Sequence, residues 1–467
     1  MPPINFVLER LKAEFGESYA NTLWRDVVDN VKQYGIYDGA GQVWETKNQD
    51  YTPTKRIINH IAHLIKEENR HMFARAPEIT INPVGDDEKN KERCKALENW
   101  LRRVLEDSGW QAMLPKAGRD ACIGKRVTLK LTGGPKQPIR VGFRPALESF
   151  SDSDPEDSTR IERIVFLYST TPGVEEPAAQ RYFFQKYYME NGRCKMDEII
   201  YNGFGSPVEE RRKGADTGLD CLPAYTIIND GLTGDPIGES DVADLWDCAD
   251  AYNHLTSDDQ DALKFNMFPQ RVFEDASEDS LAQIKIAPGA MIDLQTDPAA
   301  IDRQAKYGML EAGFNYDARL ENHLKRIKSD MYALMCVPEG TPEDYKAMGI
   351  SGKAMRALYW KLTSRCEEKW ASWDTALKWM VHTLEKMAVA YGQGAEFAGA
   401  DYTVTIEHLY PIMDDEEEER ELDLREVAQK ARSIKSYVEK WQPNTDADGE
   451  LKQIAQERAM LEEYYGR

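Results

Sequence analysis

GESDVADLWDCADAYNHLTSDDQDALKF, residues 238–265, predicts a long helix with one apolar stripe and many acidic residues. Ser240 can cap a helix of about 27 residues that ends near Asn266 and is about 40 Å long at 1.5 Å per residue. Its acidic residues show no metal-ligand spacing, so we interpret them as a charged face rather than as catalytic carboxylates. The acidic face comprises Asp241, Asp244, Asp247 and Asp250, followed by Asp258, Asp259 and Asp261, and the apolar stripe comprises Val242, Leu245, Ala249, Tyr252, Leu255 and Leu263.

A second helix is predicted further along the chain, over residues 309–334. Its apolar residues recur at alternating spacings of four and three, which is typical of a helix packed along its length on other helices. Residues 267–308, between the two helices, are punctuated by prolines and contain the strand-like pieces QRVF, QIKI and AMIDL. The apolar stripe of the second helix is Leu320, Leu324, Ile327, Met331 and Leu334.

The segment VPEGTPEDYKAMGISGKAMRALYWKL, residues 337–362, follows the second helix. It predicts a short capped helix at Thr341-Pro342, a break at Gly349, and a very long helix from Ser351 to about Tyr391. The long helix carries four tryptophans, more than one face of a monomer can hide, so we expect them to form an intersubunit surface. They are Trp360, Trp370, Trp373 and Trp379.

The other parts of the chain add strands and shorter helices, so the predicted fold class is α+β. β-branched and aromatic runs between residues 125 and 230 predict an antiparallel meander, with a hairpin turn at Asn191-Gly192. The remaining predicted elements are helices over 1–36, from the cap at Thr52-Pro53 to about Arg75, and over 88–105, then a strand over 402–410, a helix from 414 to Trp441, a turn at 443–449 and a last helix.

Composition limits the function classes. The 467 residues are 41% hydrophobic and 30% charged, as in a folded protein, and contain no run of about 18 apolar residues that could span a membrane. The amino terminus does not have the pattern of a signal peptide, and the seven scattered cysteines suggest reduced thiols. The net charge of −22 argues against a protein that grips DNA tightly, because such a surface needs clustered Lys and Arg.

Four motifs that could indicate a cofactor or a catalytic site are incomplete or absent. Residues 349–354 approach a phosphate-binding loop, but Ala347 and Ala354 occupy positions that require Gly and Ser or Thr. Residues 444–449 imitate half of a calcium loop, yet Ala455 stands where a bidentate Glu is needed. The seven histidines include no HExxH pair, and no GxSxG is present. We therefore expect no catalytic residues, no metal and no cofactor.

The order of these elements resembles that of the portal proteins of tailed double-stranded DNA bacteriophages, particularly the SPP1-like group. The similarity extends over residues 50–460 and is strongest in the stretches 238–265 and 337–362 quoted above. YTPTKRIINHIAHLIKEENRHMFARAPEITI (51–81) and IKSYVEKWQPNTDADGELKQIAQE (434–457) also resemble segments of that family.

The resemblance implies a division of the chain into the parts of a portal subunit. These would be a wing formed by 1–237 and 352–413, stem helices within 238–266 and 309–334, a clip at 267–308, a tunnel loop at 335–351 and a crown at 414–467.

The resemblance also implies a non-enzymatic function and a set of partners. The chain would form a homo-oligomeric ring of about twelve subunits at one capsid vertex of the virion, after assembly in the host cytoplasm. Double-stranded DNA would pass through the ring without sequence specificity during packaging and ejection. The implied protein partners are the terminase, the head-completion adaptor, and the major capsid and scaffolding proteins, with no membrane.

Two sets of residues are the candidates for contact with DNA. The tunnel loop would touch the duplex by shape and transient contacts, through Glu343, Asp344, Tyr345, Lys346 and Met348. Basic residues of the second stem helix could bind phosphate or form intersubunit salt bridges to the acidic helix, and these are Arg319, Lys325, Arg326 and Lys328.

Two other function classes are compatible with parts of the pattern. A cytosolic helical scaffold or coiled-coil interaction protein, with no DNA role, would explain the heptad-like stripes alone. A nucleotide-dependent enzyme is disfavoured by the failed phosphate loop.

Overall fold

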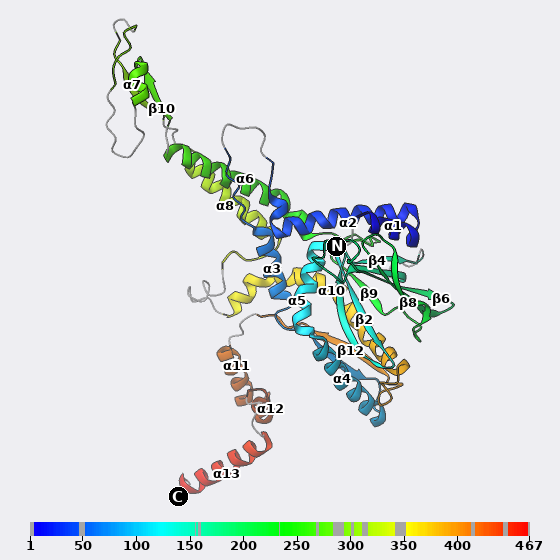
Figure 1. Ribbon diagram of the computed structural model, residues 1–467. Helices are drawn as coiled ribbons and strands as arrows, with labels where there is room; N and C mark the ends of the chain where they lie inside the picture. The colour runs from blue at the N-terminus through cyan, green and yellow to red at the C-terminus, as the bar shows by residue number, and fades with distance from the viewer. Residues whose placement is uncertain are drawn as a thin grey trace. The chain divides into compact units, whose positions relative to one another are not determined.

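A computed structural model describes residues 4–45, 52–154, 156, 160–232, 234–267, 270–283, 294–299, 303–310, 316–340, 352–411, 416–441 and 447–465. The chain divides into two compact units. The first comprises Met1–Val337 and Ser364–Leu409, and the second comprises Pro338–Thr363 and Tyr410–Arg467. Helices and antiparallel sheets occur together, which confirms the predicted α+β class (Figure 1). None of the described helices is both long and apolar enough to cross a membrane.

The N-terminal part of the first unit is helical, but its helices differ from the predicted ones. The single helix expected over 1–36 is two, because Gly16 adopts a left-handed φ of 77° that interrupts the helical backbone. The helix expected from Thr52 begins only at His60, where the Asn59 side chain accepts a hydrogen bond from the Ala62 amide. The helices are α1 (Ile4–Phe15), α2 (Glu17–Asp38), the 3-10 turn η1 (Ala40–Gln42), α3 (His60–Met72), α4 (Glu88–Ser108) and α5 (Trp110–Gly124).

The predicted meander is two antiparallel sheets rather than one. The β6–β7 hairpin turns at Asn191 and Gly192, both at positive φ, as the Asn-Gly pair predicts. One face of the larger sheet packs on α1 and α2 through a core that includes Phe6, Leu11 and Val165. The larger sheet has the order β4 (Ser149–Ser153), β5 (Ile161–Ser169), β6 (Tyr182–Glu190), β7 (Arg193–Tyr201) and β8 (Pro207–Asp216), and the smaller has the order β3 (Gln137–Pro145), β2 (Arg126–Gly134) and β9 (Ala224–Ile228).

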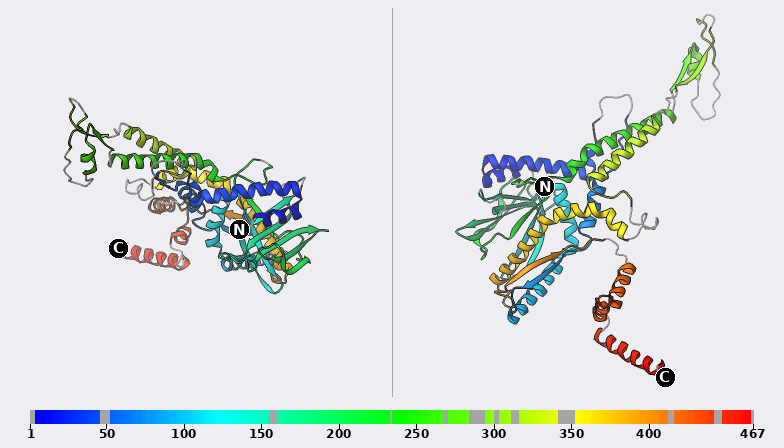
Figure 2. Two further views of the ribbon diagram at one scale, coloured as in Figure 1. Left: turned by 45° about the horizontal axis from the view of Figure 1, so that its top comes forward. Right: turned by 180° about the vertical axis from the view of Figure 1, so that it is seen from behind.

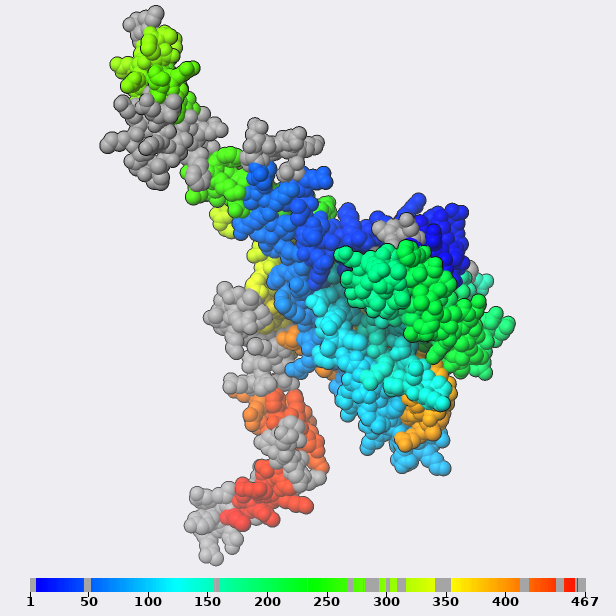
Figure 3. All heavy atoms as spheres, viewed as in Figure 1, coloured from blue at the N-terminus to red at the C-terminus, as the bar shows by residue number. Residues whose placement is uncertain are grey.

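A two-stranded sheet joins distant parts of the sequence. Strand β1 (Glu78–Pro83) pairs antiparallel with β12 (Tyr402–Glu407). Helix α4 packs beside this sheet, and the Asn90 amide donates to the carbonyl of Asp401 at 2.8 Å. In Figure 3 the orange atoms of the later segment therefore lie next to the blue atoms of α4.

Helices α6 (Asp241–Met267) and α8 (Asp317–Leu334) pack antiparallel along each other (Figures 1 and 2). The apolar stripe of α6, from Val242 to Leu255, belongs to one core cluster with Ile327 and Met331 of α8. Leu263 and Leu334, the last residues of the two predicted stripes, are exposed instead. The second helix begins at Asp317 rather than at residue 309, since β11 (Lys306–Leu310) pairs with β10 (Gln270–Glu274). Helix α7 (Glu278–Gln283) lies between these strands in sequence, while most of QIKI and AMIDL falls outside the described residues.

The long helix α10 (Gly352–Ala390) belongs to both units, with residues from Ser364 onward in the first. The second unit also contains the C-terminal helices. The helix expected over 414–441 is two, and the Asp423 carboxylate accepts from Arg432, Lys440 and the Trp441 indole across the break. These helices are α11 (Glu416–Ala428), α12 (Ile434–Trp441) and α13 (Ala447–Tyr465).

Candidate functional site at the start of helix α6

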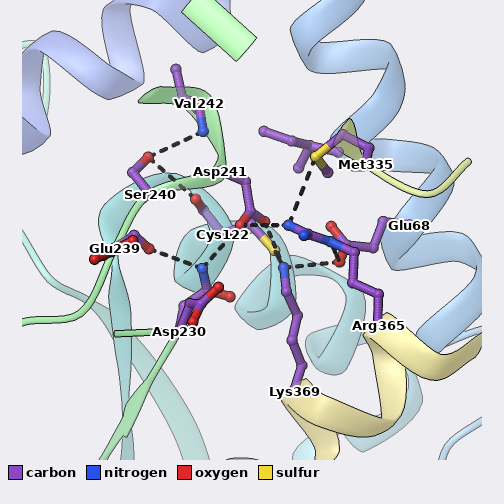
Figure 4. Close-up of polar contacts among 12 residues, drawn as sticks. Glu68, Cys122, Asp230, Glu239, Ser240, Asp241, Val242, Met335, Arg365 and Lys369 are labelled. Atoms are coloured by element: carbon purple, nitrogen blue, oxygen red, sulfur yellow. Dashed lines mark hydrogen bonds and ion pairs between the residues drawn. The ribbon is translucent and has the colours of Figure 1, made fainter. Parts of the chain in front are cut away.

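The first residue of α6, Asp241, is buried and does not contribute to an exposed acidic face. Its side chain is only 3% exposed. The preceding residue, Ser240, accepts a hydrogen bond from the Val242 amide at 3.3 Å and donates one to the carbonyl of Ile123 at 2.7 Å. The predicted cap is therefore correct, but the cap seats the start of the helix on α5 and carries Asp241 into the interior (Figure 4).

Asp241 belongs to a buried cluster of four charged side chains, which we call the ion cluster: Glu68, Asp241, Arg365 and Lys369. The Lys369 Nζ lies 2.5 Å from Asp241 Oδ2 and 2.9 Å from Glu68 Oε1. The Arg365 Nε lies 2.9 Å from Glu68 Oε1, and its Nη2 lies 3.0 Å from Asp241 Oδ1. The cluster thus fastens three elements, α3, α6 and α10, at one point (Figure 4).

The electrostatics of the ion cluster depend on burial and on mutual pairing. Burial opposes ionisation of Asp241, but Lys369 and Arg365 outweigh it and hold its pKa below the ordinary value. Burial likewise opposes the charge of Lys369, and the facing carboxylates raise its pKa well above the usual range. Burial is the dominant influence at Glu68 and raises its pKa. Two anions and two cations balance, so the cluster is stable as a set and costly to break singly.

The carboxylates of the ion cluster, together with the Cys122 thiol, could also be considered as ligands for a metal ion. Ligand atoms of Glu68, Cys122 and Asp241 lie within 4.8 Å of one another, and this is the group among the described residues with such geometry. The Lys369 Nζ, however, sits on both carboxylates and 3.3 Å from the Cys122 Sγ, where a cation would have to bind. Burial also raises the pKa of the Cys122 thiol well above its ordinary value, which disfavours the thiolate. The residues suit a structural ion network better than a metal centre.

Further along α6, three polar side chains bind an extended segment of the chain. We call Asn253, Ser257 and Asp261 the polar ladder. Two residues of extended chain advance about 6.7 Å, and four helical residues advance about 6.0 Å, so alternate amides of the segment meet every fourth side chain of the helix. The amides of Thr54, Arg56 and Ile58 donate to Asp261 Oδ2, Ser257 Oγ and Asn253 Oδ1 at 2.8, 2.9 and 2.9 Å.

The polar ladder explains why the predicted helix at Thr52-Pro53 does not form there. The Thr54 hydroxyl donates to the Asp261 carboxylate. The Ser257 hydroxyl, which accepts from the Arg56 amide, donates to the Asn253 carbonyl of its own helix at 2.7 Å. The side-chain amide of Asn253 also donates a hydrogen bond to Gln42 Oε1 at 2.9 Å. Because these partners come from α6, about 200 residues away in sequence, the local capping signal could not reveal them.

Asp261, predicted as part of the acidic face, is buried in the polar ladder. The remaining predicted acidic and basic residues lie on the surfaces of α6 and α8 and do not meet the ion cluster. Asp244 and Asp247 are exposed, and Asp250 is half-buried, 3.6 Å from His254. On α8, Arg319, Lys325 and Arg326 are exposed and Lys328 is half-buried. Lys325 pairs with Glu321 at 2.7 Å, and the Lys328 Nζ lies 5.5 Å from the centroid of the Tyr332 ring.

The tryptophans of α10 are a correction to the sequence interpretation. Trp370 and Trp373 are 1% and 3% exposed, and both pack edge-on against Phe73 inside the subunit. They cannot form an intersubunit surface, because residues of the same chain already bury them: Phe143 of β3 also packs on Trp373, and His408 stacks on Trp370. Trp379 is half-buried against Tyr225, at 5.3 Å between ring centroids, and Trp360, in the second unit, is 69% exposed.

The tunnel-loop residues Glu343, Asp344, Tyr345, Lys346 and Met348 lie outside the described residues. Sequence reasoning missed Arg365 and Lys369, as well as Asn253 and Ser257. One signal was available, since Glu68 falls on the apolar face of its helix, where a charge needs a partner. The identity of that partner depends on the tertiary fold.

A family model described as "Phage portal protein, SPP1 Gp6-like" matches residues 15–464, nearly the whole chain. No curated protein matches the chain.

Proposed function

This chain belongs to the family of SPP1 Gp6-like phage portal proteins, and we propose that it forms the twelve-subunit DNA channel of a tailed phage head. The family is structural, and it implies an oligomeric ring, a channel for DNA and a place at the capsid vertex of the virion. The match from residue 15 to residue 464 carries this conclusion, because it includes every described element from α2 to α12 and all but the last residue of α13.

The finer roles follow as parts of the proposal. The ring would be assembled in the host cytoplasm, dock the terminase while DNA enters, and afterwards dock the head-completion adaptor. Capsid and scaffolding proteins would surround it, and no reaction would be catalysed by the subunit itself. The proposed division keeps α6 and α8 as the stem, the segment containing β10 and β11 as the clip, residues 335–351 as the tunnel loop and residues 414–467 as the crown.

The ion cluster would then hold the root of the stem. It ties the first turn of α6 to α3 and to the part of α10 that follows the tunnel loop in sequence. The polar ladder adds a second attachment along the same face of α6. Both features support a stem that is fixed firmly to the body of its subunit, as a channel wall under the load of DNA transport requires.

The acidic charge of the chain fits a channel that must release DNA. Each copy has a formal net charge of −22, and a ring multiplies it. An anionic wall repels phosphates from all sides and creates no deep binding well, so the duplex can slide.

The mass of the purified protein tests the proposal. We expect particles near twelve times 53.3 kDa in mass photometry. A cytosolic helical scaffold would instead give a monomer or dimer, and a sample with only such species at micromolar concentration would contradict the ring.

A further inference from the structure

Resting on the proposed ring, we infer that α8 of each subunit lies beside α6 of the next, with Arg319 and Arg326 paired to Asp258 and Asp250 of the neighbouring copy. The occupant of this surface is therefore a second copy of the chain. The charged residues of the two helices are complementary and lie at matching positions along the helix pair.

The charges concerned are not neutralised within the subunit. Arg319 and Arg326 are exposed, and neither forms an ion pair with any other described residue. Asp258 is likewise exposed without an ion pair in the described part of the chain, and Asp250 has only the His254 imidazole at 3.6 Å. Since α6 and α8 pack through their apolar stripes, their charged faces remain for another molecule.

The spacing of the two pairs matches. Arg319 and Arg326 are seven positions apart, which is about two turns and about 10.5 Å along one side of a helix. Asp250 and Asp258 are eight positions apart, or about 12 Å along the helix and about 80° around it. The difference is small compared with the reach of an arginine side chain, so both pairs can form at once.

The arginines and the aspartates also lie at matching positions along the axis of the helix pair. Tyr316 lies near Asp259, whose charge adds to the burial that raises the pKa of the tyrosine. Asp330 lies near Cys248. Burial raises the pKa of the Cys248 thiol, and the charge of Asp330 raises it further. Because α6 and α8 lie side by side and antiparallel (Figure 1), these two proximities place Arg319 about level with residues 256–259 and Arg326 about level with residues 249–252. Asp258 and Asp250 fall within these two ranges.

In a ring with rotational symmetry, the match in axial position within one subunit also holds between neighbouring subunits. In a cyclic ring all copies have equal height along the axis, so residues that are level within one subunit are level with those of the next. If the stem helices run along the channel, the arginines of one copy therefore meet the aspartates of another without any vertical shift. Each such pair is exposed and individually weak, but it repeats at every interface of the ring.

DNA phosphate is the competing partner for the same arginines. The level-matched aspartates favour protein, because a carboxylate beside each arginine repels a phosphate. A phosphate role would leave ring assembly untouched, and the experiment separates the two cases.

Charge reversal tests the inference. We expect Arg319→Glu/Arg326→Glu and Asp250→Lys/Asp258→Lys each to reduce the ring fraction in mass photometry about tenfold at low salt. Mixing the two purified variants should restore rings containing both, since every interface of an alternating ring then joins opposite charges. A single chain carrying all four changes should also assemble. Arg102→Glu/Arg103→Glu, on exposed positions of α4, is the matched control and should leave the ring unchanged.

The outcomes are distinguishable. Wild-type protein that forms no ring would contradict the proposed function itself. A wild-type ring with unaffected variants, or variants that fail alone and in the mixture although circular dichroism shows them folded, would overturn the inference alone. Intact rings of Arg319→Glu/Arg326→Glu that no longer retain DNA would assign the arginines to phosphate instead.

Discussion

Replacing Lys369 by methionine is expected to lower the free energy of unfolding by ~3–5 kcal/mol. Methionine preserves most of the side-chain volume but leaves the carboxylates of Glu68 and Asp241 facing one fewer cation in a place where both are 1–3% exposed. The cost arises mainly from the uncompensated buried charge rather than from the lost attraction. Urea denaturation followed by tryptophan fluorescence measures it, because Trp370 and Trp373 are buried nearby on the same helix.

The control is Lys378→Met, an exposed position on α10, which should change stability by less than about 0.5 kcal/mol. The double variant Glu68→Gln/Lys369→Met removes one charge of each sign. It should be destabilised by clearly less than the two single variants added together, since the remaining Asp241–Arg365 pair stays balanced. If Lys369→Met behaves like Lys378→Met, the ion cluster is not what fastens α3, α6 and α10.

The second large effect is expected at the tunnel loop. Lys346→Glu should reduce the amount of packaged DNA by about tenfold while rings still assemble, because a reversed charge in each copy would add repulsion at the place where we propose that the loops approach the duplex most closely. A nuclease-protection assay of DNA in assembled heads measures this amount.

The conservative variant Lys346→Arg keeps the charge and is expected to package normally. A bulky replacement of Met348 should obstruct the channel and act like Lys346→Glu. Normal packaging by Lys346→Glu, or its failure to form rings, would count against a role for this loop in contact with DNA.

Local patterns predicted the elements whose causes are local. The helix expected from Ser240 to about residue 266 is observed as Asp241–Met267, since its cap and its apolar stripe both lie in that stretch. The Asn191-Gly192 turn is likewise encoded in two residues. By contrast, residues 52–59 carry a good capping signal and are nevertheless extended, because the polar ladder of α6 binds their amides.

The candidate site depended on tertiary contacts and was therefore only partly visible. Asp241 reads as one acid of an exposed face until α5 and α10 are placed around it. Trp370 and Trp373 suggested a surface between subunits because the sequence shows too many aromatics for one helix face. It does not show that Phe73, the residue that follows α3, packs against both rings. The sequence shows how many charged and aromatic residues a helix carries, but it does not show which other element of the fold covers them.

Electron cryo-microscopy of the purified particle tests the central claim most directly. The account predicts a closed ring with twelve-fold symmetry, with the α6–α8 pairs standing around an open central channel and residues 341–351 projecting into it. A particle without a channel, or a ring whose 341–351 segments lie on the outer surface, would contradict it.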